Sequence, residues 1–343
     1  MKKNLINDAS ELLLKSISGK SEEAYFEDET YKTVEFNERN FNAIIVGKKD
    51  VKVGFVDGGN IEIVKSSNFS LQLIRLFWTI YHGKKRIDAE RIEFYLLARA
   101  VNKDNMIYYE TEIIAGQEWP KELNMRFYSY DTSIRQGFHR ADISFMANIV
   151  RRFGEVLMAV RACENLAKND IIVLDGDLEA SYPKEDELLE RLYNKSKDGI
   201  IIGGLSKTST LLSNSGNSFS AMLNQRQGKW YYYPVVEIQS NMHKAEILFA
   251  KLHEKSSYIF KIEIYNKQKE HIPEAVAAFS ENATDAIFLG YPYGLIDAHK
   301  FAKADANERD FHKIQLMAKL GKKWKDVERY LRAVDGHGVL DKV

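Results

Sequence analysis

The sequence predicts an α/β fold, because buried strands and a long amphipathic helix alternate along the chain. Residues 51–56, 171–175 and 199–205 are short runs rich in Val and Ile, as is typical of strands inside a sheet. Between the first two runs, residues 142–166 repeat apolar side chains at helical spacing. No internal repeat, low-complexity tract or interdomain linker interrupts this pattern, so we expect one domain with additions.

The remaining elements follow from the same periodicities. We predict helices at residues 4–18, 185–196, 270–280 and 305–332, the last being one helix or a pair. We predict further strands at residues 61–65, 68–80, 230–238, 247–252, 258–265 and 285–289. Residues 82–86 are typical of a hairpin turn, residues 36–46 fit either a helix or a strand, and residues 88–130 indicate an elaboration of weak periodicity.

The composition limits the classes of function. The chain has 343 residues, with 49 basic and 49 acidic side chains, so any nucleic-acid site has to be a local basic groove. One cysteine, Cys163, excludes an internal disulfide and a Cys-rich zinc site, and its apolar neighbours favour a buried thiol. Neither a signal peptide nor an apolar run of membrane-spanning length is visible. We therefore expect a cytoplasmic protein in a reducing environment.

Two aspartates follow buried strands and are each followed by glycine. Asp57 precedes Gly58 and Gly59, which permit a sharp turn, and Asp175 precedes Gly176. Open α/β sheets bind ligands at the carboxyl ends of their strands, so both carboxylates are expected at one rim. Two carboxylates at close range need a proton or a metal between them. The alternative interpretation is two plain turns.

Three further side chains are candidates for the same site. Glu155 lies at the edge of the apolar stripe of the 142–166 helix, where it either reaches the site or stays at the surface. Lys207 follows a strand that ends in glycines, and it either contacts a phosphate or is a solvated loop residue. The spacing around Lys207 fails the nucleotide P-loop pattern, which excludes ATP binding there. His299 follows the rigid turn at residues 290–294 and could equally be a core histidine.

The order of these motifs resembles the NurA nuclease family. The motifs are Val56-Asp57-Gly58-Gly59, Glu155 on a helix, Leu174-Asp175-Gly176, Gly204-Leu205-Ser206-Lys207-Thr208-Ser209, and Gly290 to His299. The resemblance covers residues 45–305, and its last motif is the most specific. It implies an RNase H-like mixed sheet flanked by helices, and a metal centre formed by Asp57, Glu155, Asp175 and His299. Glu164 lies on the same predicted helix and remains an alternative to Glu155.

The resemblance also implies an activity and partners. It implies a Mn²⁺-dependent DNA nuclease, with Mg²⁺ as a possible substitute, that acts as a single-strand endonuclease and 5′-to-3′ exonuclease. Such enzymes resect the ends of DNA double-strand breaks together with a hexameric translocase of the HerA type. A homodimer that caps this ring is expected, with residues 1–44 as a helical dimer or partner contact and residues 45–343 as the nuclease domain.

In a two-metal site each residue has an expected role. Asp57 would bridge two ions, while Glu155, Asp175 and His299 would complete their coordination. Lys207 would hold a substrate phosphate or offset charge in the transition state. Tyr291 and Tyr293 would stack on a base or only pack the turn.

Two other classes of function share parts of this pattern. Another RNase H-like nuclease, such as an RNase or a resolvase, would use the same carboxylates. A non-catalytic adaptor of a DNA translocase would need the Asp-Gly motifs only as turns.

Overall fold

The computed structural model describes residues 5–17, 23–45 and 50–333. One mixed sheet forms the centre of the molecule, with strands in the order β2-β10-β12-β13-β9-β8-β3-β4-β5-β6-β7. The strands of this sheet are β2 (Phe41–Ala43), β3 (Lys52–Lys65), β4 (Phe69–His82), β5 (Lys85–Lys103), β6 (Met106–Ile114), β7 (Arg126–Tyr128), β8 (Ile171–Asp175), β9 (Ile201–Ser206), β10 (Trp230–Tyr232), β12 (Ala245–Lys251) and β13 (Phe260–Tyr265). A separate pair joins β1 (Tyr31–Thr33) to β11 (Val236–Ile238).

Five of these strands form the core of the sheet. Their order is β5-β4-β3-β8-β9, and β4 alone runs opposite to the other four. This order and these directions are those of an RNase H-like sheet, so the predicted mixed sheet flanked by helices is confirmed. The predicted antiparallel group of residues 230–265 extends the same sheet through the pairing of β13 with β9.

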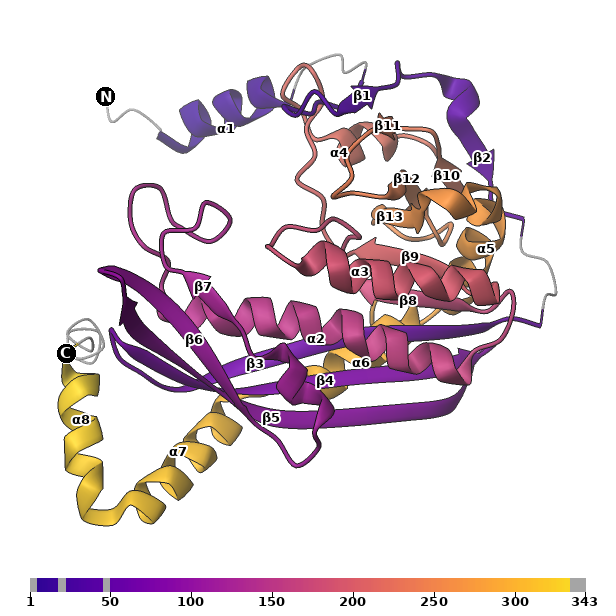
Figure 1. Ribbon diagram of the computed structural model, residues 1–343. Helices are drawn as coiled ribbons and strands as arrows, with labels where there is room; N and C mark the ends of the chain where they lie inside the picture. Colours follow the sequence, from indigo (N-terminus) through magenta and orange to yellow (C-terminus); the bar gives the residue numbers. More distant parts are fainter. Residues whose placement is uncertain (1–4, 18–22, 46–49, 334–343) are drawn as a thin grey trace.

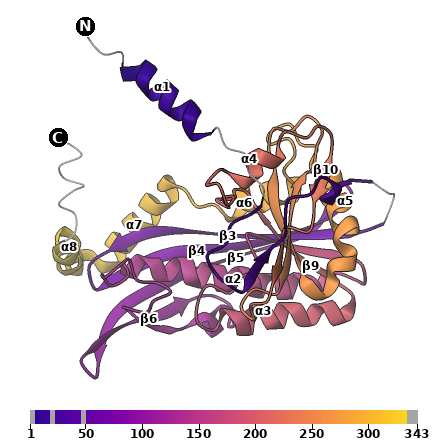
Figure 2. The same cartoon turned by 90° about the horizontal axis from the view of Figure 1, so that it is seen from above.

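Helices cover both faces of this sheet (Figure 1). The helices are α1 (Leu5–Ser16), α2 (Met146–Ala162), α3 (Glu185–Tyr193), α4 (Phe219–Leu223), α5 (Ile272–Asn282), α6 (Tyr293–Ala302), α7 (Ala306–Leu320) and α8 (Trp324–Arg332). Seen from above, α2 and α3 lie on one side of the long strands and α6 and α7 on the other (Figure 2). Because side chains alternate along β3, Val56 packs into the α2 core whereas Phe55 packs into the α6 core. None of the helices in the described ranges is long and apolar enough to cross a bilayer.

The Asp57-Gly58-Gly59 motif is not a turn, contrary to the sequence prediction. Strand β3 continues through it to Lys65, with Gly58 opposite Leu76 and Gly59 opposite Arg75 on β4. The glycines are needed for close packing instead. A Cβ atom on Gly58 would lie 2.7 Å from Glu155 Oε1, and one on Gly59 would lie 2.3 Å from the carbonyl oxygen of Ala302. The absent side chains therefore let helices on both faces approach Asp57.

Three other predictions of secondary structure also need correction. Residues 88–130 are mostly the long strands β5 and β6, so β5 belongs to the core and is not an elaboration. Residues 285–289 form no strand, because the Asp285 side chain accepts the backbone N–H of Ile287 in a local turn. In the 1–44 segment, predicted to be helical, Tyr31–Thr33 form the strand β1, which pairs with β11; of the two alternatives for residues 36–46, the strand is the one observed, as β2 pairs with β10.

Replacement of Gly59 by Ala should destabilise the fold. The added methyl group would meet the backbone of Ala302, which cannot rotate away, so we expect a loss of about 1–3 kcal/mol from overpacking. Thermal melting of Gly59→Ala measures this loss. The matched control is Gly116→Ala, because no atom lies within 4 Å of a Cβ at Gly116. Equal melting temperatures of the two variants would contradict the close approach.

Candidate metal centre

Asp57 and Asp175 lie side by side because their strands are adjacent and parallel. Val56 on β3 is in register with Leu174 on β8, which brings the next residue of each strand to the same level. By the alternation of side chains, both carboxylates emerge on the α6 face of the sheet. Asp57 is only 4% exposed, and the Asp175 side chain is 11% exposed. The two acidic groups therefore meet with little water to screen them.

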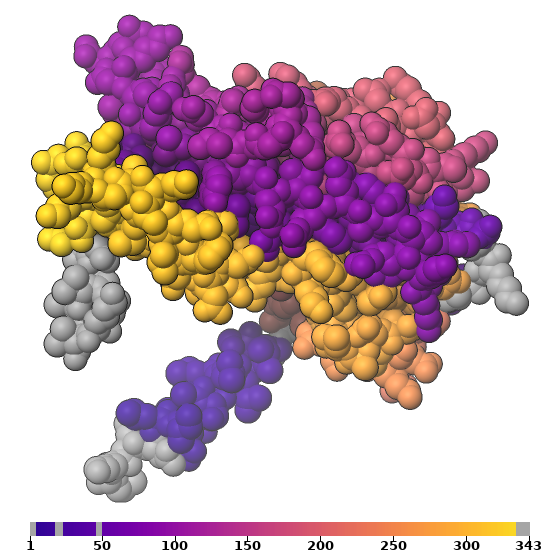
Figure 3. Space-filling model, turned by 90° about the horizontal axis from the view of Figure 1, so that it is seen from below, coloured from indigo at the N-terminus to yellow at the C-terminus, as the bar shows by residue number. Residues whose placement is uncertain are grey.

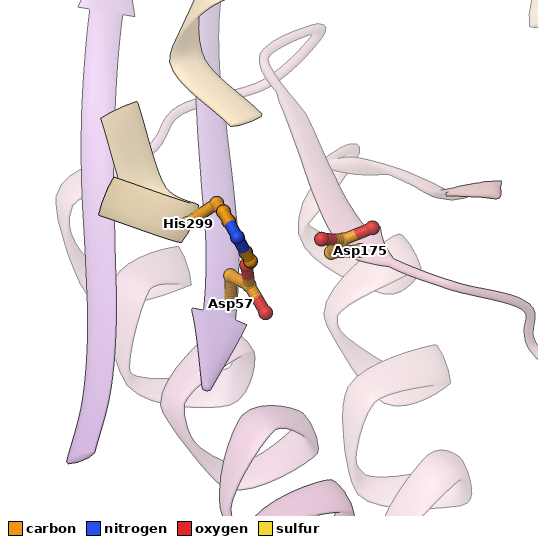
Figure 4. A group of neighbouring side chains, drawn as sticks. All are labelled: Asp57, Asp175 and His299. Atoms are coloured by element: carbon orange, nitrogen blue, oxygen red, sulfur yellow. The ribbon is translucent and has the colours of Figure 1, made fainter. Parts of the chain in front are cut away.

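His299 approaches this pair from helix α6. Its Nδ1 atom lies 2.9 Å from Asp57 Oδ2 (Figure 4), and the His299 side chain is 55% exposed. Asp57, Asp175 and His299 each offer one ligand atom, and the three atoms lie within 4.8 Å of one another. Two carboxylates and an imidazole at this spacing can share a divalent cation. The structure thus brings together three of the four predicted ligands.

Lys207 supplies the positive charge nearest to the carboxylates. It directly follows β9, and its Nζ atom donates a hydrogen bond to Asp175 Oδ2. The same nitrogen lies 3.8 Å from Asp57 Oδ2 and 3.3 Å from His299 Nδ1. In this arrangement the ammonium group takes the position at which a cation would meet both carboxylates. Lys207 thus pairs with the carboxylates of the centre, while its side chain stays 34% exposed.

The two aspartates titrate differently. Burial and the negative charge of Asp57 raise the pKa of Asp175 to about 6. Burial alone would also raise the pKa of Asp57, but the hydrogen bond with His299 and the charge of Lys207 hold that pKa below its usual value. Because its pKa is the lower of the two, Asp57 stays ionised to lower pH than Asp175 does. A carboxylate that stays ionised is the one better suited to contact a cation.

Glu155 lies on α2, on the opposite face of the sheet from His299. Its side chain is 3% exposed and forms an ion pair with Arg151 one turn earlier on the helix. Burial raises the pKa of Glu155 to about 7, and the charges of Asp57 and Asp175 add to the effect against the opposing charge of Arg151. Glu155 is outside the 4.8 Å cluster but borders it across Gly58. The alternative residue, Glu164, is exposed in the short 3-10 helix that follows α2.

The two tyrosines of the 290–294 turn are placed differently from the prediction of base stacking. The Tyr291 ring is 1% exposed, so it cannot stack on a nucleotide; its hydroxyl instead donates to Asp175 Oδ1 at 3.4 Å. The Tyr293 ring packs edge-on against Tyr81, with centroids 4.8 Å apart. Tyr291 therefore holds the Asp175 carboxylate in position, and both rings serve packing.

Two arginines next to the centre were missed in the sequence analysis. Arg151 stands four residues before Glu155, a spacing typical of ion pairs on a helix, which could have revealed it. Arg152 is buried against the fully buried Glu185 and donates to the carbonyl oxygen of Asp177 at 2.7 Å. It thereby holds the loop that follows Asp175. The pairing of Arg152 with Glu185 spans 33 residues, so no local pattern could have indicated it.

Binding of Mn²⁺ should weaken as the pH falls from about 8 to about 5. Carboxylates bind metal ions only when deprotonated, so protons on Asp175 and Glu155 compete with the ion. Because the pKa of Asp175 is about 6 and that of Glu155 about 7, the competition sets in across the neutral range. Titration calorimetry of the whole chain with Mn²⁺ at several pH values measures the effect.

The variants Glu155→Gln and Glu164→Gln provide a matched pair for this titration. Gln at position 155 cannot bind a proton, so the pH dependence near pH 7 should flatten and the affinity should fall. Gln at position 164 should leave the affinity and its pH dependence unchanged, because Glu164 is exposed. An affinity independent of pH, or a greater effect at position 164, would rule out the assigned ligands.

Comparisons with known proteins give structural matches only. No protein-family model and no curated protein matches the chain. Among solved structures, it is similar to the NurA nuclease from Sulfolobus solfataricus, with 14% identity, a TM-score of 0.49, and 94% of this chain and 95% of that chain covered. It is also similar to the catalytic domain of human Endonuclease V, with 12% identity, a TM-score of 0.38, and 92% and 96% covered. Endonuclease V from Ciona intestinalis, in complex with inosine-containing DNA, gives 12% identity, a TM-score of 0.39, and 77% and 87% covered. The family that the motif order resembles is thus among the similar structures, and the assignment of the site depends on the side chains described above.

Proposed function

We propose that this chain is a metal-dependent nuclease that hydrolyses phosphodiester bonds of DNA. The observation that carries the proposal is the meeting of Asp57, Asp175 and His299, whose ligand atoms lie within 4.8 Å of one another. Lys207 adds a cationic donor at the same place. Carboxylates that hold a divalent ion, next to a group that binds phosphate, are the parts that phosphodiester hydrolysis requires.

The donor set fits a divalent cation such as Mn²⁺ or Mg²⁺. Carboxylate oxygens suit both ions, and an imidazole nitrogen favours Mn²⁺. In two-metal hydrolysis, bound ions ~3.5–4 Å apart activate the attacking water and stabilise the leaving oxygen. Asp57 lies between Asp175 and His299 and is the residue that would be shared. Glu155 would take part from the other face, where its carboxylate borders Gly58.

The protein's own groups would orient the substrate. Lys207 would exchange its carboxylate contacts for a phosphate oxygen, since a cation in the centre would repel its ammonium group. Tyr291 would keep Asp175 in position through the hydrogen bond of its hydroxyl. Arg151 would hold the Glu155 carboxylate in place until it is needed. In each of these roles a side chain holds a reacting group in position before the reaction begins.

The biological role that we propose follows the resemblance of the motifs. It is resection of double-strand-break ends at the nucleoid, by single-strand endonuclease and 5′-to-3′ exonuclease activity, together with a HerA-type hexameric translocase. The balanced net charge of the chain supports delivery by a motor, because a nuclease that is fed by a motor has less need of long-range attraction for DNA. An RNase or a resolvase would cleave RNA or branched DNA instead of free DNA ends. An adaptor without catalysis would tolerate substitution of Asp57.

Replacement of Asp57 or Asp175 by Asn should lower cleavage at least ~100-fold without unfolding the protein. Each change keeps the shape of the side chain but removes one negative charge from a centre that has to hold dications. The assay uses end-labelled single- and double-stranded DNA, and matched RNA, with Mn²⁺, Mg²⁺ or EDTA. Activity should require a divalent ion, with Mn²⁺ preferred.

The control for this assay is Asp198→Asn. Asp198 is exposed and precedes β9, whereas Lys207 follows the other end of the same strand. The cleavage rate of the Asp198→Asn variant should therefore equal that of the wild type. Full activity in EDTA, or near-normal cleavage by both Asp57→Asn and Asp175→Asn, would reject the nuclease centre. Cleavage of RNA but not DNA would favour the alternative nuclease.

Helix α1 offers a surface for assembly. No residue of the helix is buried. Its five large apolar side chains are 64–74% exposed; they are Leu5, Ile6, Leu12, Leu13 and Leu14. Figure 3 shows the helix standing apart from the body of the molecule. The helix therefore does not cover the core of its own chain, which was the alternative to assembly. A short helix with exposed leucines is marginal in water, so a second copy or the translocase is the surface that we propose for it.

Deletion of residues 1–20 should abolish dimerisation or binding of the translocase. Light scattering measures the mass of the truncated and full-length chains, and a pull-down with the translocase measures docking. The folded body should remain intact because no described residue of α1 is buried. A truncated chain that stays dimeric and still binds the translocase would refute this role.

A further inference from the structure

The charges of this chain are balanced overall but unevenly distributed. Residues 311–332, which form most of α7 and all of α8, contain seven Lys and Arg side chains and two acidic side chains. Six of the seven basic side chains are exposed; they are Lys319, Lys322, Lys323, Lys325, Arg329 and Arg332. A chain without net charge can bind nucleic acid only through a local basic surface of this kind.

Helix α8 separates an apolar side from a basic side. Trp324 and Leu331, two helical turns apart, pack on the apolar cluster of β3 and β4. The side that remains exposed therefore offers charge instead of the apolar contact by which helices insert into a lipid surface. It carries basic residues at spacings of three and four. We call them the basic face of α8: Lys322, Lys325, Arg329 and Arg332.

The positive charges of the basic face are poorly compensated. Like charges three or four residues apart on a helix face one another and destabilise it. In the part of the chain that the structure describes, Arg332 alone of the four forms an ion pair, with Glu328 at 3.0 Å. The other acidic residue of α8, Asp326, forms no ion pair there. Lys322 and Lys325 also lie at the N-terminal end of α8, where the helix dipole is positive. A bound anion would relieve both effects.

The basic face belongs to the same side of the sheet as the metal centre. By the alternation of side chains, Asp57 and Ile63 emerge on the same face of β3, and Ile63 shares an apolar cluster with Trp324. The hydroxyl of Ser66, just after β3, donates to the carbonyl oxygen of Tyr330 at 3.1 Å and so fixes the end of α8. Figure 3 shows the yellow helices α7 and α8 at one end of the molecule.

The distance between the centre and α8 matches one turn of a DNA duplex. Asp57 and Ser66 are nine residues apart along β3 and its end, which is about 30 Å at a rise of about 3.3 Å per residue. A duplex lying on a surface presents the same backbone strand to it once per helical turn, about 34 Å. A duplex with one end at the centre would therefore present its backbone again near α8.

The surface near the centre can also contact a backbone. Lys300 directly follows His299, and Lys303 comes one helical turn after His299; both lysines are exposed. Neither forms an ion pair within the described ranges. Between these lysines and α8, the outward side of α7 is apolar, with Phe311 and Ile314 58% and 64% exposed. Basic contacts thus occur at two places, and α7 lies between them, where a duplex presents a groove.

The acidic side chains on this route are already engaged. Glu308 forms an ion pair with Arg75 at 2.7 Å, and Asp310 forms one with Arg309 at 2.8 Å. The side chain of Asp305 accepts the backbone N–H of Glu308 at the start of α7. These carboxylates therefore do not cancel the excess of positive charge on the basic face.

We infer that the basic face of α8 binds the phosphate backbone of duplex DNA about one helical turn from the metal centre. Lys300 and Lys303 contact the backbone close to the end that is cut, and a groove of the duplex faces α7. Contacts with phosphates carry no sequence information, so the binding is independent of sequence. The inference rests on the proposed nuclease function for the position of the cut end, whereas binding of the duplex needs no cleavage.

Fluorescence anisotropy of a labelled duplex in EDTA tests this inference without hydrolysis. The duplex has about 25 base pairs, more than two helical turns. The double variant Lys325→Ala/Arg329→Ala should weaken binding about tenfold, equally for two unrelated sequences. The slope of log affinity against log salt should fall by about 1.8, because each lost phosphate contact contributes about 0.9. The double variant Lys325→Arg/Arg329→Lys keeps both charges and should bind like the wild type.

The matched control is the double variant Lys168→Ala/Lys197→Ala, which removes the same charge. Both lysines are exposed and precede β8 and β9, at the end of these strands opposite to Asp175. Its affinity and salt slope should equal those of the wild type. An unchanged affinity and slope in Lys325→Ala/Arg329→Ala, or an equal loss in the control, would overturn the inference.

Cleavage of DNA hairpins with Mn²⁺ tests the position of the duplex. For a stem of about 20 base pairs, which reaches α8, Lys325→Ala/Arg329→Ala should raise KM about tenfold and leave kcat unchanged. For a stem of about 6 base pairs, which is too short to reach α8, KM should equal that of the wild type. An equal rise of KM for both stems would overturn the placement. Absence of cleavage by the wild type would overturn the proposed nuclease function, while the anisotropy measurement still decides whether the basic face binds duplex DNA.

Discussion

The repulsion between Asp57 and Asp175 is the constraint on which the site depends. Register between two parallel strands forces the carboxylates together on one face of the sheet, and burial removes the water that would screen them. The protein answers with groups from two other elements, Lys207 after β9 and His299 on α6. An arrangement that is costly without a cation is one that binds a cation well.

The sheet can hold this site because two consecutive glycines of β3, Gly58 and Gly59, leave room for the helices on its two faces to come close. Gly58 lets Glu155 come close from the α2 face, and Gly59 lets the end of α6 come close from the other. Larger side chains there would push the helices outward and move His299 and Glu155 away from Asp57. The same two glycines are therefore needed both for the close packing of the helices and for the assembly of the centre.

Local patterns predicted the strands β8 and β9, the helix α2 and the meeting of Asp57 and Asp175 at one rim of the sheet, whereas only the resemblance of the motifs pointed to His299 beside them. They failed where tertiary contacts decide the structure. The Asp-Gly-Gly motif has the composition of a turn, but pairing with β4 keeps it extended. Tyr291 lies in a Gly- and Pro-containing turn, where an exposed ring that stacks on a base is plausible, but Phe260 and Phe288 cover its ring. The pairing of Arg152 with Glu185 joins residues 33 positions apart in sequence, which no periodicity reports.

The most direct test of the account is to locate Mn²⁺ in a crystal of the wild-type protein by its anomalous scattering. The account predicts a peak in contact with the carboxylates of Asp57 and Asp175 and with the His299 ring, and a Lys207 side chain that has moved away from Asp175. A crystal saturated with Mn²⁺ that shows no peak there, with the Lys207–Asp175 ion pair intact, would contradict it.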